Sequence, residues 1–339
     1  MFMEFLLGPS LLLAAGFFQG SFMLPMKFTR RWAWENTWLV FSATAYLIWP
    51  WSLALLTVPH LGLVFGATGV RSLVLIGLFG VGWGLGALTF GLGVDMLGLA
   101  LGFTVIIGVA ASAGTLIPMI VLSPDRLWGR AGLLISVALL LVLTGVAICS
   151  WAGKLRDAGR DSAGQVPRRS FAVGLMVCIA SGLLSACGNL GFAFGSEVIQ
   201  KALAYGASDV MAGNSLWALI TVPLFVCNAG YCGWLLKRRG TVKLFFDPRT
   251  WRHWFLGSLM GALWIAGFAC YAPGTRRLGS LGTSVGWAMM MAMMIITANV
   301  WGYLTGEWKQ ASLSARRLLL SGVGVLIVAV GVAGFANYR

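Results

Sequence analysis

The chain has 339 residues, of which 59% are hydrophobic and 10% are charged, and its mean hydropathy is +0.87. Soluble domains are about 45–50% apolar and about 25% charged, so this composition excludes a water-soluble fold and predicts an integral membrane protein. The formal net charge is +14, but the Lys and Arg residues lie between apolar segments rather than on one solvated face. We therefore expect a lipid bilayer, and no nucleic acid, as a partner.

A helix needs about 20 apolar residues to cross a bilayer, and ten segments of the chain meet this requirement. The connections between them are short, and the two longest, 153–170 and 236–253, are charged rather than folded. The sequence therefore predicts an all-α integral membrane protein with ten transmembrane helices and no soluble domain. The predicted spans lie near residues 5–25, 37–57, 72–93, 98–122, 131–152, 171–195, 210–235, 254–272, 281–304 and 318–336.

The third and eighth spans carry the same pattern. Trp83 has glycines three residues before and after it, and Trp264, 181 positions later, has glycines at the same two places. Such a repeat indicates two related halves, and we assign residues 1–152 and 171–339 to them, joined by a cytoplasmic connection at 153–170. Because each half holds five spans, an odd number, the halves enter the bilayer with opposite orientation. This predicts two inverted five-helix repeats, an arrangement typical of secondary transporters.

Basic residues are distributed unequally between the two sides of the membrane. The connections after spans 1, 3, 5, 7 and 9 contain 17 of the Lys and Arg residues, and the other side, including the termini, contains 7. Since Lys and Arg concentrate in cytoplasmic connections, the first set is predicted to be cytoplasmic. Both termini are then predicted to lie outside.

Trp83 and Trp264 are the first candidates for a binding site. They lie well inside their spans and occupy equivalent positions in the two halves, and inverted repeats bring such positions together at the midplane, where substrates bind. Flat aromatic rings there suit a ligand with one apolar face and several hydroxyls. Trp287 also lies well inside a span and is a further candidate. For any one of these residues, simple packing is the alternative.

Side-chain amides within spans form a second set of candidates. An amide without a partner in hydrocarbon is costly, so each must face a neighbouring helix or a wet cavity. Amides both donate and accept hydrogen bonds, as the recognition of a neutral polyol requires, but bonds between helices are an equally simple use of them. The set comprises Gln19, Asn189, Asn214, Asn228 and Asn299.

Acidic residues are few, and none lies in the centre of a span. Glu35 and Glu307 lie at span edges beside basic residues, and we name them as the candidates for proton coupling, with structural ion pairs as the alternative. The two histidines, His60 and His253, fall in predicted connections, and the six cysteines form no metal-ligand pattern. The glycines around Trp83 lack the strand–turn–helix context of a phosphate loop. We therefore expect no metal, no cofactor and no enzymatic activity.

Several motifs, in their order and spacing, resemble the L-rhamnose–proton symporter family, a branch of the drug/metabolite transporter superfamily. The resemblance covers nearly the whole chain. It implies a ten-span carrier of the bacterial inner membrane that takes up L-rhamnose together with protons and without ATP. The motifs are Trp32-Ala33-Trp34-Glu35, Gly80-Val81-Gly82-Trp83-Gly84-Leu85-Gly86, Asp95-Met96-Leu97-Gly98, Gly114-Thr115-Leu116-Ile117-Pro118, Asn228-Ala229-Gly230-Tyr231-Cys232 and Gly306-Glu307-Trp308-Lys309.

The chain departs from the family pattern at polar positions. Ala87 stands where an asparagine is favoured, Ile265 and Ala266 follow the second repeat tryptophan where a tyrosine and a glutamine are usual, and Gly286 replaces a common serine. The leading hypothesis is a secondary carrier that imports a small sugar, with L-rhamnose as its substrate, by alternating access.

Two other functions are compatible with the same composition. One is an exporter of drugs or metabolites with the same fold, which the missing polar groups and the methionines of the ninth span favour, because flexible thioethers suit varied apolar ligands. The other is a membrane sensor or scaffold without transport, against which the lack of a soluble effector segment counts. The methionines in question are Met289, Met290, Met291, Met293 and Met294.

Overall fold

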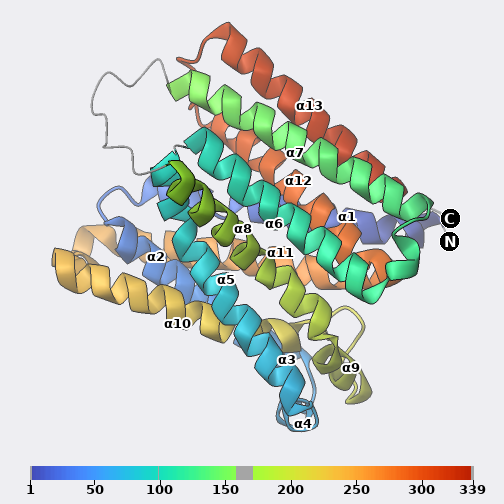
Figure 1. The fold of residues 1–339 in the computed structure, drawn as a ribbon. Helices are drawn as coiled ribbons and strands as arrows, with labels where there is room; N and C mark the ends of the chain where they lie inside the picture. The colour runs from blue at the N-terminus through green and yellow to red at the C-terminus, as the bar shows by residue number, and fades with distance from the viewer. Residues whose placement is uncertain (1, 98, 158–170, 337–339) are drawn as a thin grey trace.

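The computed structural model describes residues 2–97, 99–157 and 171–336. Within these ranges the chain is a bundle of helices, ten of which are long and apolar enough to cross a membrane (Figure 1). The prediction of an all-helical membrane protein with ten spans is therefore confirmed. The spans are built from α1 (Phe2–Ser21), α2 (Trp34–Ser42) with α3 (Trp49–Thr57), α5 (Val70–Leu97), α6 (Leu99–Leu122), α7 (Arg130–Asp157), α8 (Phe171–Phe194), α10 (Asn214–Arg239), α11 (Trp251–Arg277), α12 (Gly282–Leu304) and α13 (Leu313–Phe335).

The second span is not one regular helix. Between α2 and α3 the chain forms a π-helical segment, Ala43–Ile48, which ends two residues before Pro50. Proline has no N–H to donate and its ring crowds the preceding turn, so an extra residue is taken into that turn. Gly261 of α11 lies against this segment, since a Cβ atom there would come 2.8 Å from the backbone nitrogen of Ala45.

The connections contain more structure than the sequence suggested. The segment 236–253 was expected to be unfolded, but α10 continues to Arg239, and two 3-10 turns, η4 (Thr241–Phe246) and η5 (Pro248–Thr250), lead into α11. His253 is consequently in the first turn of α11 and is buried beside the ring of Trp32, not in a connection. Of the predicted connection 153–170, residues 153–157 continue α7, and the remainder lies outside the described residues.

Short elements also cap both ends of the bundle. They are η1 (Leu24–Phe28) after the first span, α4 (Leu61–Gly66) after the second, η3 (Pro124–Arg126) after the fourth, α9 (Ser196–Ala204) after the sixth and η6 (Gly279–Leu281) after the eighth.

The helix contacts repeat when each helix is replaced by its equivalent in the other predicted half. Helix α5 packs against α8 and α10, and its counterpart α11 packs against α1 and α2. Helix α8 also contacts α6, as α1 contacts α12, and the fifth and tenth spans, α7 and α13, pack along each other (Figure 1). Helix α12 is the most buried of the spans.

Connections that follow odd-numbered spans meet at one end of the bundle, and those that follow even-numbered spans meet at the other. Lys27, after the first span, pairs with Glu307, after the ninth. Ser123, after the fourth span, donates to the carbonyl oxygen of Ser280, after the eighth, at 3.3 Å. Helix α1 begins and α13 ends at this second end (Figure 1).

Two glycines of α5 provide a matched test of the packing. A Cβ atom at Gly80 would overlap the carbonyl oxygen of Ile220 and lie 2.8 Å from Cγ of Pro223, whereas one at Gly77 would meet nothing within 4 Å. We expect Gly80→Ala to destabilise the protein by about 1–3 kcal/mol, because α5 and α10 must separate. Gly77→Ala should cause no loss. Thermal unfolding in detergent measures both, and equal midpoints for the two variants would contradict the close contact.

Candidate functional site

The two repeat tryptophans lie in direct contact. The ring centroids of Trp83 on α5 and Trp264 on α11 are 5.5 Å apart, with an interplanar angle of 34°. Gly188 of α8 makes room for this pair, since a Cβ atom there would be 2.7 Å from Cε2 of Trp83. Trp264 is only 4% exposed. The structure thus brings together the two tryptophans that the repeated sequence pattern alone had singled out.

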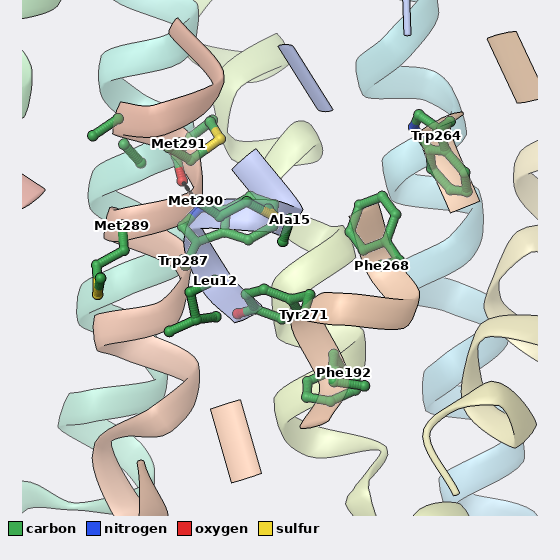
Figure 2. Packing of buried hydrophobic residues seen from close by; sticks show 14 of the residues in the cluster. Leu12, Ala15, Phe192, Trp264, Phe268, Tyr271, Trp287, Met289, Met290 and Met291 are labelled. Carbon is green, nitrogen blue, oxygen red and sulfur yellow. Dashed lines mark hydrogen bonds between the residues drawn. The ribbon is translucent and has the colours of Figure 1, made fainter. Parts of the chain in front are cut away.

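Helix α11 presents three aromatic rings on one face. Trp264, Phe268 and Tyr271 are spaced i, i+4 and i+7, which places them in line along a helix. Phe268 contacts both tryptophans, with centroid distances of 5.4 Å to Trp83 and 4.6 Å to Trp264. Figure 2 shows Phe268 between Trp264 and Tyr271 along this helix.

Two further rings extend this group toward the end of the bundle that carries α9. The centroid of Trp217 lies 4.6 Å from that of Phe268, and Phe192 stacks on Trp217 at 5.0 Å with an interplanar angle of 11°. The indole Nε1 of Trp217 is buried and has no hydrogen-bond acceptor among the described residues. We call the following residues the aromatic cluster: Trp83, Trp264, Phe268, Tyr271, Trp217 and Phe192.

Two of the predicted amides lie against the aromatic cluster. Gln19 of α1 donates from Nε2 to the carbonyl oxygen of Trp264 at 2.8 Å. Asn189 of α8 donates to the carbonyl oxygen of Gly114 at 2.7 Å and accepts from the hydroxyl of Tyr271 at 2.6 Å. These bonds join α1, α6, α8 and α11, so both amides hold the walls of the cluster in position.

Trp287 of α12 also belongs to this region. Its ring centroid lies 6.2 Å from that of Tyr271, and its indole N–H donates to the carbonyl oxygen of Ala110 at 3.1 Å. The ring lies over Gly114, where a Cβ atom would come 2.7 Å from Cδ1 of the indole. Trp287 therefore forms a wall between α6 and α11.

The other three predicted amides lie away from the tryptophan pair. Asn214 donates to the hydroxyl of Thr57 at 3.0 Å, and Asn299 donates to the carbonyl oxygen of Ile295 in its own helix at 2.8 Å. Asn228 accepts from the indole N–H of Trp38 at 2.9 Å. The structure thus gathers Gln19, Asn189 and Trp287 around the aromatic cluster, but not these three residues.

Glu35 is buried at one end of the bundle, with a relative exposure of 0%. Its carboxylate accepts from Nη1 of Arg239 at 3.1 Å and from the hydroxyl of Thr241 at 2.8 Å. The sequence suggested a nearby arginine as its partner, whereas the actual partner lies at the far end of α10. Glu35 therefore joins the start of α2 to the end of α10.

Glu307 lies at the same end and is half-exposed. It pairs with Lys27 and accepts from Nη1 of Arg156 at 3.2 Å. The guanidinium of Arg156 also lies 5.0 Å from the ring centroid of Trp308. In the sequence Glu307 lies beside Lys309. Its partners are instead Arg156, near the end of α7, and Lys27, in the connection after the first span.

The methionines of α12 do not form an open apolar surface. Met289, Met290 and Met291 are each no more than 5% exposed and belong to the same core cluster as Leu12 and Ala15 of α1 (Figure 2). Met293 packs against Gly16, since a Cβ atom added to Gly16 would come 2.5 Å from Cβ of Met293. These side chains fill the core of the bundle, which removes one argument for an exporter.

The chain is similar to known proteins along nearly its whole length. The sequence model of the L-rhamnose-proton symport protein family matches residues 6–337. Proteins named L-rhamnose-proton symporter from Escherichia coli (strain UMN026 / ExPEC), Yersinia pestis (strain Pestoides F) and Shigella dysenteriae serotype 1 (strain Sd197) are each 26% identical to it over 320 residues, which is 92% of this chain and 92% of each relative. The matched range spans the bundle almost end to end and includes both repeat tryptophans. The chain therefore belongs to the L-rhamnose-proton symport protein family.

Proposed function

We propose that the chain imports L-rhamnose together with protons, and that the aromatic cluster forms the sugar site. The family match over residues 6–337 is the observation that carries this proposal, and it favours an importer over an exporter. Trp83, Trp264 and Trp287 supply ring faces for the apolar side of the sugar. Gln19 and Asn189 position those rings and supply polar atoms beside them.

The tilted contact between Trp83 and Trp264 has a mechanistic consequence. With ring centroids 5.5 Å apart and an interplanar angle of 34°, the rings leave no room for a sugar between them until the two helices move apart. Separation of α5 from α11 is therefore part of the transport cycle in this proposal. Such a movement corresponds to rocking of one repeat against the other around a fixed site.

We also propose that the chain consists of two inverted repeats, residues 1–152 and 171–339. The exchange of helix contacts between the halves supports this division, since α5–α8 corresponds to α11–α1 and α5–α10 to α11–α2. With the basic connections inside, the termini face outward and the protein lies in the bacterial inner membrane. The drug/metabolite transporter superfamily remains a prediction from the motifs.

We propose that Glu35 and Glu307 couple transport to protons. Both lie at the basic, cytoplasmic end and join elements of different halves or distant spans. Protonation removes the negative charge of Glu35 and weakens its bonds to Arg239 and Thr241, so that α2 and α10 can separate at that end.

Membrane vesicles of uniform right-side-out orientation that contain the protein test the proposal. We expect accumulation of labelled L-rhamnose when the outside is made acidic, and only equilibration without a pH gradient. Vesicles without the protein serve as the control. Equal rates with and without the gradient would exclude proton coupling, and the absence of L-rhamnose uptake would exclude the substrate.

Glutamine substitutions test the two carboxylates separately. Glu35→Gln and Glu307→Gln should abolish accumulation driven by the pH gradient and retain exchange of labelled for unlabelled sugar, because glutamine keeps the shape but cannot titrate. Asp125→Asn is the control, since Asp125 is exposed and pairs only with the adjacent Arg126. If a variant still accumulates sugar, the carboxylate that it lacks does not couple transport to protons.

A further inference from the structure

A cavity of about 300 Å³ opens beside α9, between that helix and the junction of α11 with α12. This size is at the lower end of the range for pockets that hold small ligands. We call it the α9 cavity. Its lining consists of Phe192, Ala193, Ser196, Ile199, Gln200, Thr275, Arg276, Gly279 and Thr283.

Helix α9 presents hydrogen-bonding groups to this space. Ser196 and Gln200 lie four residues apart, hence on one face of the helix, and both are exposed. Val198 and Ala202, on the other side of α9, are buried in the bundle. The helix is therefore fixed by its apolar face and leaves a hydroxyl and an amide directed to the cavity.

Arg276 supplies a donor from the opposite wall. Its Nη2 pairs with Asp209, in the connection between α9 and α10. Its Nη1 is buried and has no hydrogen-bond partner among the described residues. A buried donor without an acceptor is costly in the absence of a ligand, so this atom is suited to bind an oxygen of a molecule in the cavity.

The inner wall of the α9 cavity is continuous with the aromatic cluster. Phe192 lines the cavity and stacks on Trp217. Thr283, also in the lining, accepts from Asn189 and from the Tyr271 hydroxyl through its carbonyl oxygen, each at 3.2 Å. The ring of Phe192 thus belongs to both the cavity and the aromatic cluster, and it lies between a ligand in the cavity and Trp217.

A second cavity, of about 590 Å³, lies on the other side of α9 and is less suited to a polar ligand. Its acidic residue, Glu197, already accepts from the Gly69 amide at 2.9 Å and from the Ser72 hydroxyl. Leu75, Phe79 and Phe194 make up much of the rest of its lining. Arg71 also lines this second cavity, but it is exposed to solvent. The buried donor without an acceptor among the described residues, Nη1 of Arg276, lies at the α9 cavity.

We propose that the α9 cavity is a second sugar-binding site, which a neutral polyol of monosaccharide size occupies before it reaches Trp83 and Trp264. Arg276, Gln200 and Ser196 bond its hydroxyls, and Phe192 faces its apolar side. The order of occupation rests on the proposed function, which places this end of the bundle outside the cell.

Cysteine labelling tests occupancy of this site. Gln200→Cys should react with a membrane-impermeant maleimide added to whole cells, and L-rhamnose should slow the reaction at least about threefold. Ser208→Cys, on an exposed residue outside the cavity lining, is the matched control whose labelling should not change. The parent protein gives the background from the native cysteines. Equal labelling of Gln200→Cys with and without sugar would overturn the site.

Kinetics separate a binding role of Arg276 from a structural one. Arg276→Gln should raise the half-saturating L-rhamnose concentration at least about tenfold with little change in maximal rate, as expected when a charged donor is lost. Asp209→Asn removes the ion pair but keeps the guanidinium, and should change that concentration less than about twofold. Equal effects of the two substitutions would show that the ion pair, and not the cavity, matters.

These outcomes are distinct from a failure of the proposed function. If the parent protein takes up L-rhamnose but neither protection nor the Arg276 effect is seen, the α9 cavity is not a sugar site, and transport through the aromatic cluster stands. If the parent protein takes up no L-rhamnose, the substrate itself is wrong. Protection by another monosaccharide in that case would keep the cavity as a polyol site.

Discussion

Replacing Trp264 with alanine should reduce L-rhamnose uptake at least about tenfold. The substitution removes ring contacts with Trp83, Phe268 and Tyr46, whose centroids lie 5.5, 4.6 and 4.8 Å from that of Trp264. A loss of about 1.4 kcal/mol of binding free energy corresponds to a tenfold change in affinity. Uptake of labelled sugar at several concentrations measures the effect, which should fall mainly on the half-saturating concentration. Trp83→Ala should behave in the same way.

Two variants control for damage to the fold. Trp264→Phe keeps an aromatic face and should retain more uptake than the alanine variant. Trp128→Ala removes an indole of the same size from a side chain that is 92% exposed and should have no effect. The amount of protein in the membrane must be equal in all variants. Full uptake by both Trp83→Ala and Trp264→Ala would remove the sugar site from the aromatic cluster.

Replacing Arg239 with alanine should destabilise the protein by about 1–3 kcal/mol, because it leaves the buried carboxylate of Glu35 without its cation. The value is at the lower end of those for buried ion pairs, since Arg239 is 57% exposed on its side chain and Thr241 still donates to Glu35. Thermal unfolding in detergent at neutral pH gives the measurement. Arg238→Ala is the control, because Arg238 lies over the exposed ring of Trp234.

A second substitution identifies the cause of this loss. Glu35→Gln combined with Arg239→Ala should recover most of the lost stability, since no buried charge then lacks a partner. Additive losses in the double variant would mean that Arg239 acts through packing rather than through Glu35. Acidification should stabilise Arg239→Ala relative to the parent protein, because protonation neutralises the unpaired carboxylate.

The parts of the fold that could be predicted from the sequence depend on short-range rules. A bilayer fixes both the length and the apolar character of a span, so all ten spans were found. The contact between Trp83 and Trp264 followed from their equivalent places in the two halves. Phe268 and Tyr271 continue the face of Trp264 at helical spacing, so the sequence contains the signal for their place in the aromatic cluster as well.

The partners of polar groups could not be predicted, because many are equally near in sequence. Glu35 follows two arginines closely, yet it pairs with Arg239, 204 positions away, because α10 ends beside the start of α2. Asn189 and Asn299 have the same side chain, and only the packing of α8 against α6 and α11 gives the first a place beside the aromatic cluster. The π-helical segment before Pro50 likewise has a close neighbour from a distant part of the chain, Gly261 of α11.

The contact between the second and seventh spans is held by different kinds of bond at its two ends. Glu35 and Arg239 close one end with opposite charges, whereas Asn214 and Thr57 close the other with a single neutral hydrogen bond of 3.0 Å. Charge-assisted bonds are roughly twice as strong as neutral ones. The contact between the second and seventh spans should therefore open first at the Asn214 end. The carrier without substrate would then be open toward the side on which its termini lie. In the proposed mechanism, protonation of Glu35 would weaken the bond at the charged end and allow release of the sugar on the opposite side of the membrane.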